Sequence, residues 1–227
     1  MERFFGDAKS ITERVQKLSG LASFFGQSQQ DLINEAEKMD NLDFFAKVVM
    51  MDFLVEIAKS QNSEVGRYML EYFLAVIVLG KVVGANRSAA SGGQQDAVDF
   101  IDANKKLGSS KFVSNYQAAK QSQISFEKYK NKKITYVVAL REGPTSNLST
   151  EAPEPLKIQQ IKIHVFDIKY VGPTEDGRAK FLYYAPNGGT AQDAYSQMGK
   201  RLNVGAIAQK TPSFTIPLTF TTETFGS

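Results

Sequence analysis

The chain of 227 residues is long enough for one large domain or two small ones, and its 42% hydrophobic and 22% charged residues are typical of globular proteins. It contains no cysteine, which excludes disulfides, thiolate nucleophiles and cysteine-based zinc or iron–sulfur sites. The net charge of +3 is distributed unevenly, because residues 1–103 carry −5, residues 104–133 carry +7 and residues 134–227 carry +1.

The first 25 residues place apolar side chains at alternating spacings of three and four. This period of about 3.5 residues predicts one helix with an apolar seam that packs against a partner helix. The seam contains Phe4, Ile11, Val15, Leu18 and Phe25. The partner is either another helix of this chain or another subunit. Charged residues interrupt each apolar run of this segment, so we expect no secretory signal and a cytoplasmic protein or assembled particle.

Three helices are predicted over the next segment. Ser28 and Asp31 have the spacing of a capping box, which begins a short helix that ends near Met39. Residues 42–60, after a cap at Asn41, form a helix that is apolar on two flanks and should contact neighbours on both. The third helix begins near residue 62 or 63.

This third helix contains the most apolar run of the chain, residues 68–84. Only nine uncharged residues separate Glu71 from Lys81, about 14 Å of helix, whereas a bilayer core of about 30 Å needs about 20 residues. A buried core helix is the expected structure, and a segment at a membrane interface is the alternative. Gly80 and Gly84 lie on one face, where a backbone of this chain or of another subunit can approach closely.

Residues 86–94 are small and polar and predict a flexible linker, and residues 95–133 predict a basic segment of two further helices. Lysines cluster at the end of this segment, at Lys128, Lys130, Lys132 and Lys133. Phe126, Tyr129 and Tyr136 are interleaved with them, which is typical of a nucleic-acid patch. Residues 88–140 contain no arginine, however, so pairing of these lysines with an acidic protein surface is the favoured alternative.

The remaining residues alternate with the period of a strand. The pattern of residues 156–170 changes phase, which predicts a β-bulge near Val165. Thr190 and Asp193 predict a helix that ends near Leu202, followed by a short strand. Residues 214–222 predict an edge strand, because they include Pro217. Its threonine-rich outer face is a candidate for pairing with another chain, and its inner face carries Phe214, Ile216, Leu218 and Phe220.

These patterns predict an α+β fold: an N-terminal helical half, followed by a mostly antiparallel sheet of four to five strands with one helix. The predicted organisation is a helical domain over residues 1–85, the linker 86–94, the basic helical segment 95–133 and a β-rich domain over 134–227. The apolar seam, the glycine pair and the C-terminal strand are together the candidate oligomer interface.

Motifs of catalysis are not found in the sequence. His164 is the only histidine, and its place in the strand pattern predicts that it points to solvent or to a partner. No phosphate-binding loop, dinucleotide fingerprint or metalloprotease motif occurs, so we expect no cofactor, no metal and no enzymatic activity, although an enzyme that uses carboxylates alone is an alternative.

The expected function is that of a structural or assembly protein, a repeated subunit or scaffold that contacts itself or other assembly subunits. A virion, tube or scaffold component would have these properties. One alternative is a nucleic-acid-binding module that uses the lysines of residues 105–133. A second alternative is a membrane-active protein that uses the apolar helix 68–84.

Overall fold

The computed structural model describes residues 2–60, 63–83, 96–143, 159–186, 189–197 and 200–218. The α-helices are α1 (Glu2–Phe5), α2 (Ile11–Phe25), α3 (Gln29–Lys38), α4 (Asn41–Lys59), α5 (Ser63–Ile77) and α6 (Val204–Ala208). Two 3-10 helices are η2 (Tyr116–Ala118) and η3 (Gln123–Tyr129). The strands are β1 (Lys81–Val82), β2 (Phe100–Ile101), β3 (Leu107–Val113), β4 (Lys120–Ser122), β5 (Lys133–Glu142), β6 (Gln160–Pro173), β7 (Ala179–Tyr184), β8 (Gln192–Tyr195), β9 (Arg201–Asn203) and β10 (Ser213–Pro217). The predicted α+β class is confirmed.

Within the described residues, eight strands form one mixed sheet, in which β1, β2, β3, β5, β6, β7 and β8 lie side by side in that order. β10 pairs with residues 160–164 of β6 and β7 with residues 167–173, so these two strands follow one another along the same edge of β6. Strands β3 and β5 are parallel, and the other neighbours are antiparallel. The prediction of four to five mostly antiparallel strands is therefore wrong, because it omitted β1, β2, β3 and β8. β4 and β9 form a separate antiparallel pair.

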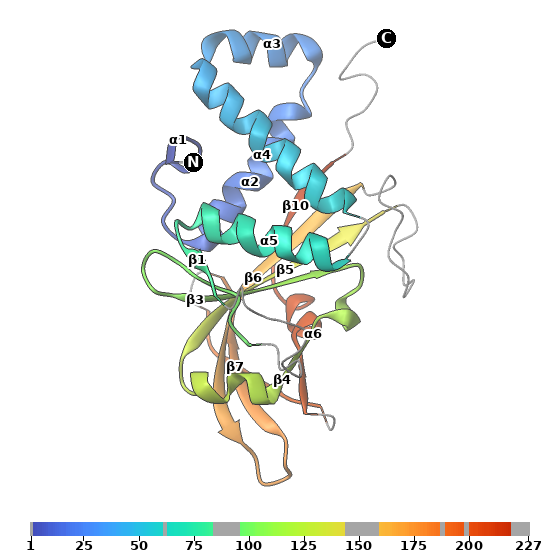
Figure 1. Ribbon diagram of the computed structural model, residues 1–227. Helices are drawn as coiled ribbons and strands as arrows, with labels where there is room; N and C mark the ends of the chain where they lie inside the picture. The colour runs from blue at the N-terminus through green and yellow to red at the C-terminus, as the bar shows by residue number, and fades with distance from the viewer. Residues whose placement is uncertain are drawn as a thin grey trace.

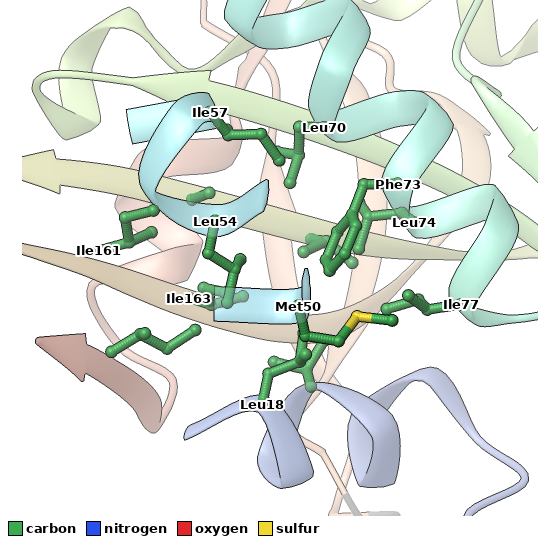
Figure 2. Packing of buried hydrophobic residues seen from close by; sticks show 14 of the residues in the cluster. Leu18, Met50, Leu54, Ile57, Leu70, Phe73, Leu74, Ile77, Ile161 and Ile163 are labelled. Carbon is green, nitrogen blue, oxygen red and sulfur yellow. The ribbon is translucent and has the colours of Figure 1, made fainter. Parts of the chain in front are cut away.

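Helices α2, α4 and α5 pack on one face of the sheet (Figure 1). Their apolar side chains meet those of β5, β6 and β10 in one cluster, where Leu18, Leu54 and Leu74 are fully buried (Figure 2). Ile161 and Ile163 reach the cluster from β6. Helix α3 lies farthest from the sheet and has no buried residue (Figure 1). The helical layer is therefore anchored through α2, α5 and one side of α4.

A second cluster fills the opposite face of the sheet. It is rich in aromatic rings: Phe126 of η3 lies edge-to-face against Phe181 with ring centroids 5.0 Å apart, and Tyr136 stacks on Phe166 at 6.2 Å. Helix α6 covers the same face. Both faces of the central strands are therefore buried.

Strand β6 contributes to both clusters. Its odd-numbered residues from Ile161 to Val165 belong to the helical cluster, whereas its even-numbered residues from Phe166 to Tyr170 belong to the aromatic one. The β5–β6 register is continuous across this change, so the predicted bulge near Val165 is wrong. The phase of the sequence pattern shifts because the strand passes from beneath one layer to the other. A register irregularity does occur, between Tyr170 and Gly172 where β6 pairs with β7.

Helix predictions are wrong in three segments of the chain. The first is interrupted after α1, where Gly6 has a φ of +50° and Ser10 starts α2 as its cap. The segment 95–133 contains β2, β3, β4 and 3-10 helices instead of two α-helices, because β3 pairs with the distant β5. In the segment 190–202, β8 pairs with β7, and the short α6 replaces the strand expected after it. Lys180 and Asp193 form an ion pair of 2.9 Å across β7 and β8.

Candidate functional site

The apolar seam at the start of the chain lies against the chain's own core. Val15 and Leu18 have no exposed surface, and Phe4, Ile11 and Phe25 pack against the same cluster from partly buried positions. Phe4 lies on α1 and the other four on α2. The structure thus shows the intramolecular alternative for this seam.

The glycine pair and the C-terminal strand also contact the chain itself. A Cβ atom on Gly80 would lie 2.1 Å from the carbonyl oxygen of Ile101, so the close backbone approach predicted there is made by β2. Ile216 is fully buried under α2, and Phe214 and Leu218 are partly buried beside it. β10 pairs with β6 alone among the described strands, which agrees with an edge position. Gly84 and Phe220 lie outside the described residues.

The predicted lysine patch is divided by the fold. Lys128 forms an ion pair with Asp96, and this hydrogen bond raises the pKa of Lys128. Lys130 lies beside Gly172 of β6. Lys132 and Lys133 line a cavity together with Lys105 and Lys106. The aromatic rings of the segment are not available for stacking on bases, because Phe126 and Tyr136 have no exposed surface and Tyr129 is partly buried.

His164 is 4% exposed, so the prediction that it faces solvent or a partner is wrong. The side chain lies on the face of the sheet that the aromatic cluster covers. Its Nδ1 lies 3.1 Å from the carbonyl oxygen of Thr211, which can only accept, so Nδ1 carries the proton. Nε2 then accepts a hydrogen bond of 2.8 Å from the Tyr116 hydroxyl. Burial lowers the pKa of His164 and raises that of Tyr116, which keeps both groups neutral at pH 7 and engaged with each other.

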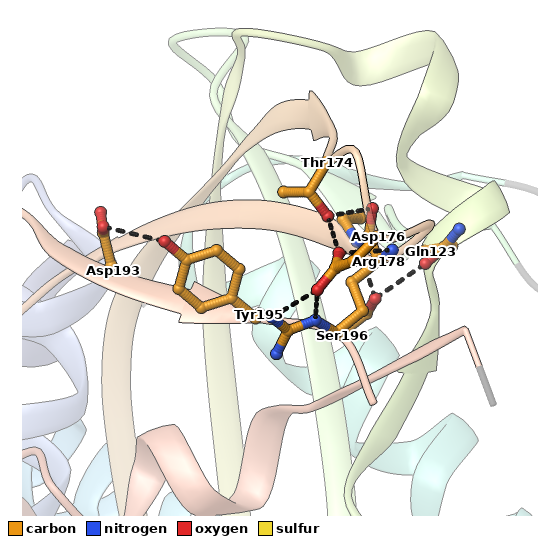
Figure 3. Close-up of polar contacts among 8 residues, drawn as sticks. Gln123, Thr174, Asp176, Arg178, Asp193, Tyr195 and Ser196 are labelled. Carbon is orange, nitrogen blue, oxygen red and sulfur yellow. Dashed lines mark hydrogen bonds and ion pairs between the residues drawn. The ribbon is translucent and has the colours of Figure 1, made fainter. Parts of the chain in front are cut away.

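A group of polar side chains surrounds the turn between β6 and β7 (Figure 3). The carboxylate of Asp176 accepts hydrogen bonds of 2.6 Å from both Thr174 Oγ1 and Arg178 Nε, and these hold the pKa of Asp176 well below its usual range. The Arg178 guanidinium lies 5.2 Å from the ring centroid of Tyr195. Ser196 Oγ accepts from a backbone N–H of β7. Each group has a structural partner, so the cluster fixes the hairpin and offers no activated nucleophile.

An exposed apolar surface in the described part of the chain was missed by the sequence reasoning. Large hydrophobic side chains are exposed along the outer sides of α4, α5 and the turn after α5, and together we call them the α4–α5 face. They are Leu42, Phe45, Val48, Val49, Phe53, Val65, Tyr68, Tyr72, Val76 and Leu79. Phe45 is 63% exposed and Tyr72 is 52% exposed. The signal was the second apolar flank of α4, which the sequence predicts to be in contact with a neighbour.

Both helices present this surface as a stripe. On α4, Leu42, Phe45, Val49 and Phe53 follow at spacings of three, four and four residues, which places them on one side of a helix. On α5 the corresponding spacing from Val65 to Leu79 is three, four, four and three. Such stripes are the pattern with which helices pack against partner helices.

The two stripes meet at an apolar cavity of about 630 Å³. Its lining includes Leu42, Phe45 and Val49 from α4 and Leu79 from the turn that follows α5. Arg3 stands at this cavity too, and it forms an ion pair of 2.7 Å with Asp40, the N-cap of α4. We call this space the Leu79 cavity.

Leu79 adopts a backbone conformation that is unfavourable for leucine. Its φ is +53°, the left-handed position of a helix C-terminal turn, where glycine or asparagine is usual. The N–H of Gly80 donates to Ala75 over 2.8 Å and the N–H of Leu79 to Val76 over 3.1 Å, so the Schellman motif is complete. A residue other than glycine costs about 1 kcal/mol or more in this conformation. The turn therefore holds an apolar side chain at the surface at the expense of backbone strain.

Across the described ranges, no group of three or more His, Asp or Glu side chains is arranged to hold a metal ion. No helix within those ranges combines the length and apolar composition that crossing a bilayer requires. Comparison of the chain with models of known protein families, with curated proteins and with solved structures finds no match. We therefore infer the function from the chemistry of the described surface.

Proposed function

We propose that the protein is a non-enzymatic assembly subunit, and that its α4–α5 face binds the same face of a second copy. The observation that carries this proposal is the concentration of exposed apolar side chains. Ten of the thirteen large hydrophobic residues that are exposed in the described part of the chain lie on this face. A surface of this kind is typical of a protein–protein interface.

The size of the face agrees with a stable dimer. Its residues are about half exposed, so each aromatic side chain presents about 100 Å² and each valine or leucine somewhat less. The ten residues together present somewhat less than about 1,000 Å². A specific interface of standard size buries about 800 Å² on each partner. Apolar patches on monomeric proteins seldom exceed about 600 Å².

The charges around the face favour a protein partner over a lipid surface. Helices that lie in a membrane interface usually carry lysine and arginine on their polar side. α4 contains three acidic and two basic residues, and α5 contains two acidic and one basic. Anionic lipid would be repelled rather than attracted by this balance.

A second copy supplies a matching surface without any further component. In a two-fold dimer the same patch is used on both subunits, so an apolar face covers itself. Two α4 and two α5 helices would then form one helical layer, with the stripes of one copy packed against those of the other. The strained Leu79 fits this role, since its side chain would gain in the dimer the burial that it lacks in one chain.

The test is self-association of purified protein, measured by sedimentation equilibrium over a wide range of concentration. We expect wild-type protein to form dimers and Phe45→Asp to weaken the association by about 2 kcal/mol or more, the effect of a hot-spot residue, or roughly 30-fold. Because Phe45 is already 63% exposed, the variant should fold. The matched control is Ile124→Asp, which places the same charge on a 47% exposed residue of η3 and should associate like wild type.

Three outcomes would overturn the proposal. One is a wild-type protein that stays monomeric at every concentration. The other is flotation of wild-type protein with phosphatidylcholine vesicles that Phe45→Asp abolishes, because the occupant of the face would then be lipid. Equal weakening by Phe45→Asp and Ile124→Asp would place the interface elsewhere.

A further inference from the structure

The parallel pairing of β3 with β5 aligns two copies of one short motif. Leu107 lies opposite Ile134, and each of these residues follows two lysines. Lys105 and Lys106 immediately precede β3, and Lys132 immediately precedes β5, which begins at Lys133. Four lysines from segments far apart in sequence therefore lie where the two strands begin.

These four lysines line one cavity of about 680 Å³, which we call the lysine cavity. Ser10, Ile11 and Thr12 reach it from the start of α2, and Thr135 contributes a further hydroxyl. The 15-residue helix α2 directs its N-terminal backbone N–H groups and the positive end of its dipole to this region. Glu13 in the first turn offsets part of this positive potential, because its carboxylate lies at the start of the helix and accepts from the N–H groups of Lys9 and Ser10.

The protein compensates the lysine charges only in part. No ion pair joins Lys105, Lys106 or Lys132 to a described carboxylate, and Lys133 lies over the ring of Tyr184 at 4.0 Å. The lining also contains two acidic residues: Asp102 accepts from the backbone N–H of Lys106, and Asp167 from the Thr135 hydroxyl over 2.7 Å. Four lysines and two aspartates give the lining a formal net charge of +2. Like charges that are held close together repel one another. An anion that bridges them would remove this repulsion.

The backbone supports the same arrangement. The turn between β2 and β3 is closed by hydrogen bonds from the N–H of Asp102 to Lys106 and from the N–H of Lys105 to Asp102, both 3.0 Å. Lys105 has a φ of +63°, a backbone angle that residues other than glycine seldom adopt. Residues held in such conformations cluster at ligand-binding sites.

We propose that the lysine cavity binds a small molecule that carries two or more phosphate charges. Its volume lies in the range of about 300–1,000 Å³ that is usual for small-ligand sites. Lysine ammonium groups and helix N-termini both bind phosphate. Apolar side chains on the wall, Val78, Phe100 and Leu107, leave room for a compact organic part. Nucleic acid fits less well, because the neighbouring aromatic rings Phe126 and Tyr136 are buried and cannot stack on bases.

Isothermal titration calorimetry with inorganic pyrophosphate tests the proposal. Wild-type protein should bind one pyrophosphate per chain, with an affinity that falls as salt is added. The double variant Lys106→Gln/Lys132→Gln should bind at least about tenfold more weakly, since each lost charge-assisted hydrogen bond is worth that factor or more. The matched control Lys38→Gln/Lys210→Gln removes the same charge from two exposed lysines outside the cavity and should bind like wild type.

A misfolded variant would be recognised by circular dichroism. Because the cavity variant removes repulsion, it should unfold without pyrophosphate at the same temperature as wild type or higher. Absence of pyrophosphate binding, or equal weakening by the control, would overturn the proposal. Tighter binding of a single-stranded oligothymidine than of pyrophosphate, weakened by both double variants, would overturn it in favour of nucleic acid. The four lysines are not part of the α4–α5 face, so failure of one proposal leaves the other standing.

Discussion

Replacing Gly80 by alanine tests how the end of α5 is fixed to the sheet. The new Cβ would lie 2.1 Å from the Ile101 carbonyl oxygen and 2.8 Å from the Asp102 Cα, both of them backbone atoms that cannot swing aside. The first gap would have to widen by about 1.3 Å to reach 3.4 Å, the lower limit of ordinary contact. Overpacking of this kind costs typically 1–3 kcal/mol, and a purely backbone clash belongs at the upper end. We expect the free energy of unfolding to fall by about 3 kcal/mol.

The control for this variant is the same substitution at Gly20, which has the opposite expected sign. No atom lies within 4 Å of a Cβ at Gly20, and the residue is exposed in the interior of α2. Alanine there should raise the free energy of unfolding by about 0.5–1 kcal/mol through helix propensity. Both are measured by urea denaturation followed by circular dichroism, in the Phe45→Asp background so that association does not contribute. A Gly80→Ala protein as stable as its parent would refute the packing of α5 on β2.

Two further substitutions probe the buried histidine and the strained turn. The pKa of His164 is lower in the folded protein than its ordinary value of 6.5, so folding favours the neutral imidazole. The stability that this provides is fully present above pH 6.5 and is lost as the pH falls from 6.5 towards the pKa of the folded state. The urea midpoint of wild type should therefore fall between pH 7 and pH 5, and the midpoint of His164→Gln should fall less over the same range. Equal decreases in the two midpoints would contradict the buried, neutral state of His164. Leu79→Asn keeps the left-handed turn. It should weaken dimerisation in sedimentation equilibrium without lowering the stability of the monomer, and unchanged dimerisation would remove Leu79 from the interface.

The helices of the first half were predictable because their signals are local. Ser28 caps α3, and α4 begins within a residue of the predicted start, with Asp40 rather than Asn41 as the cap. The break before α2 also has a local signal, since Ser10 and Glu13 form a capping box that the apolar seam concealed. Each of these features depends on residues within one or two turns of helix.

The segment 95–133 was mispredicted because distant residues decide its structure. Apolar residues between Phe112 and Phe126 have helical spacing, yet β3 is set by its pairing with β5. Asp99 is buried and accepts hydrogen bonds from the Ser109 hydroxyl and the Ser110 backbone N–H, both of 2.8 Å. Neither the register nor this carboxylate network can be read from a local pattern.

The candidate sites follow the same division. The sequence shows that α4 has two apolar flanks, but which flank the fold covers depends on where α2 and α5 pack. Likewise the lysines are visible in the sequence, while their grouping depends on the parallel register of β3 and β5. The sequence therefore showed that one site is apolar and the other basic, but not which residues form each site.

The passage of β6 between the two clusters has a consequence for how the protein opens. Its first half is held by the helical layer and its second half by the aromatic layer, while β5 runs beside both halves. Detaching either layer would expose one side of a strand that is still paired along its length. Such partial opening is unfavourable, because it exposes apolar surface to water while the strand stays paired and gains no conformational entropy. The central amides of β6 should therefore exchange with solvent only when the whole fold is lost, which makes this strand the cooperative link of the molecule.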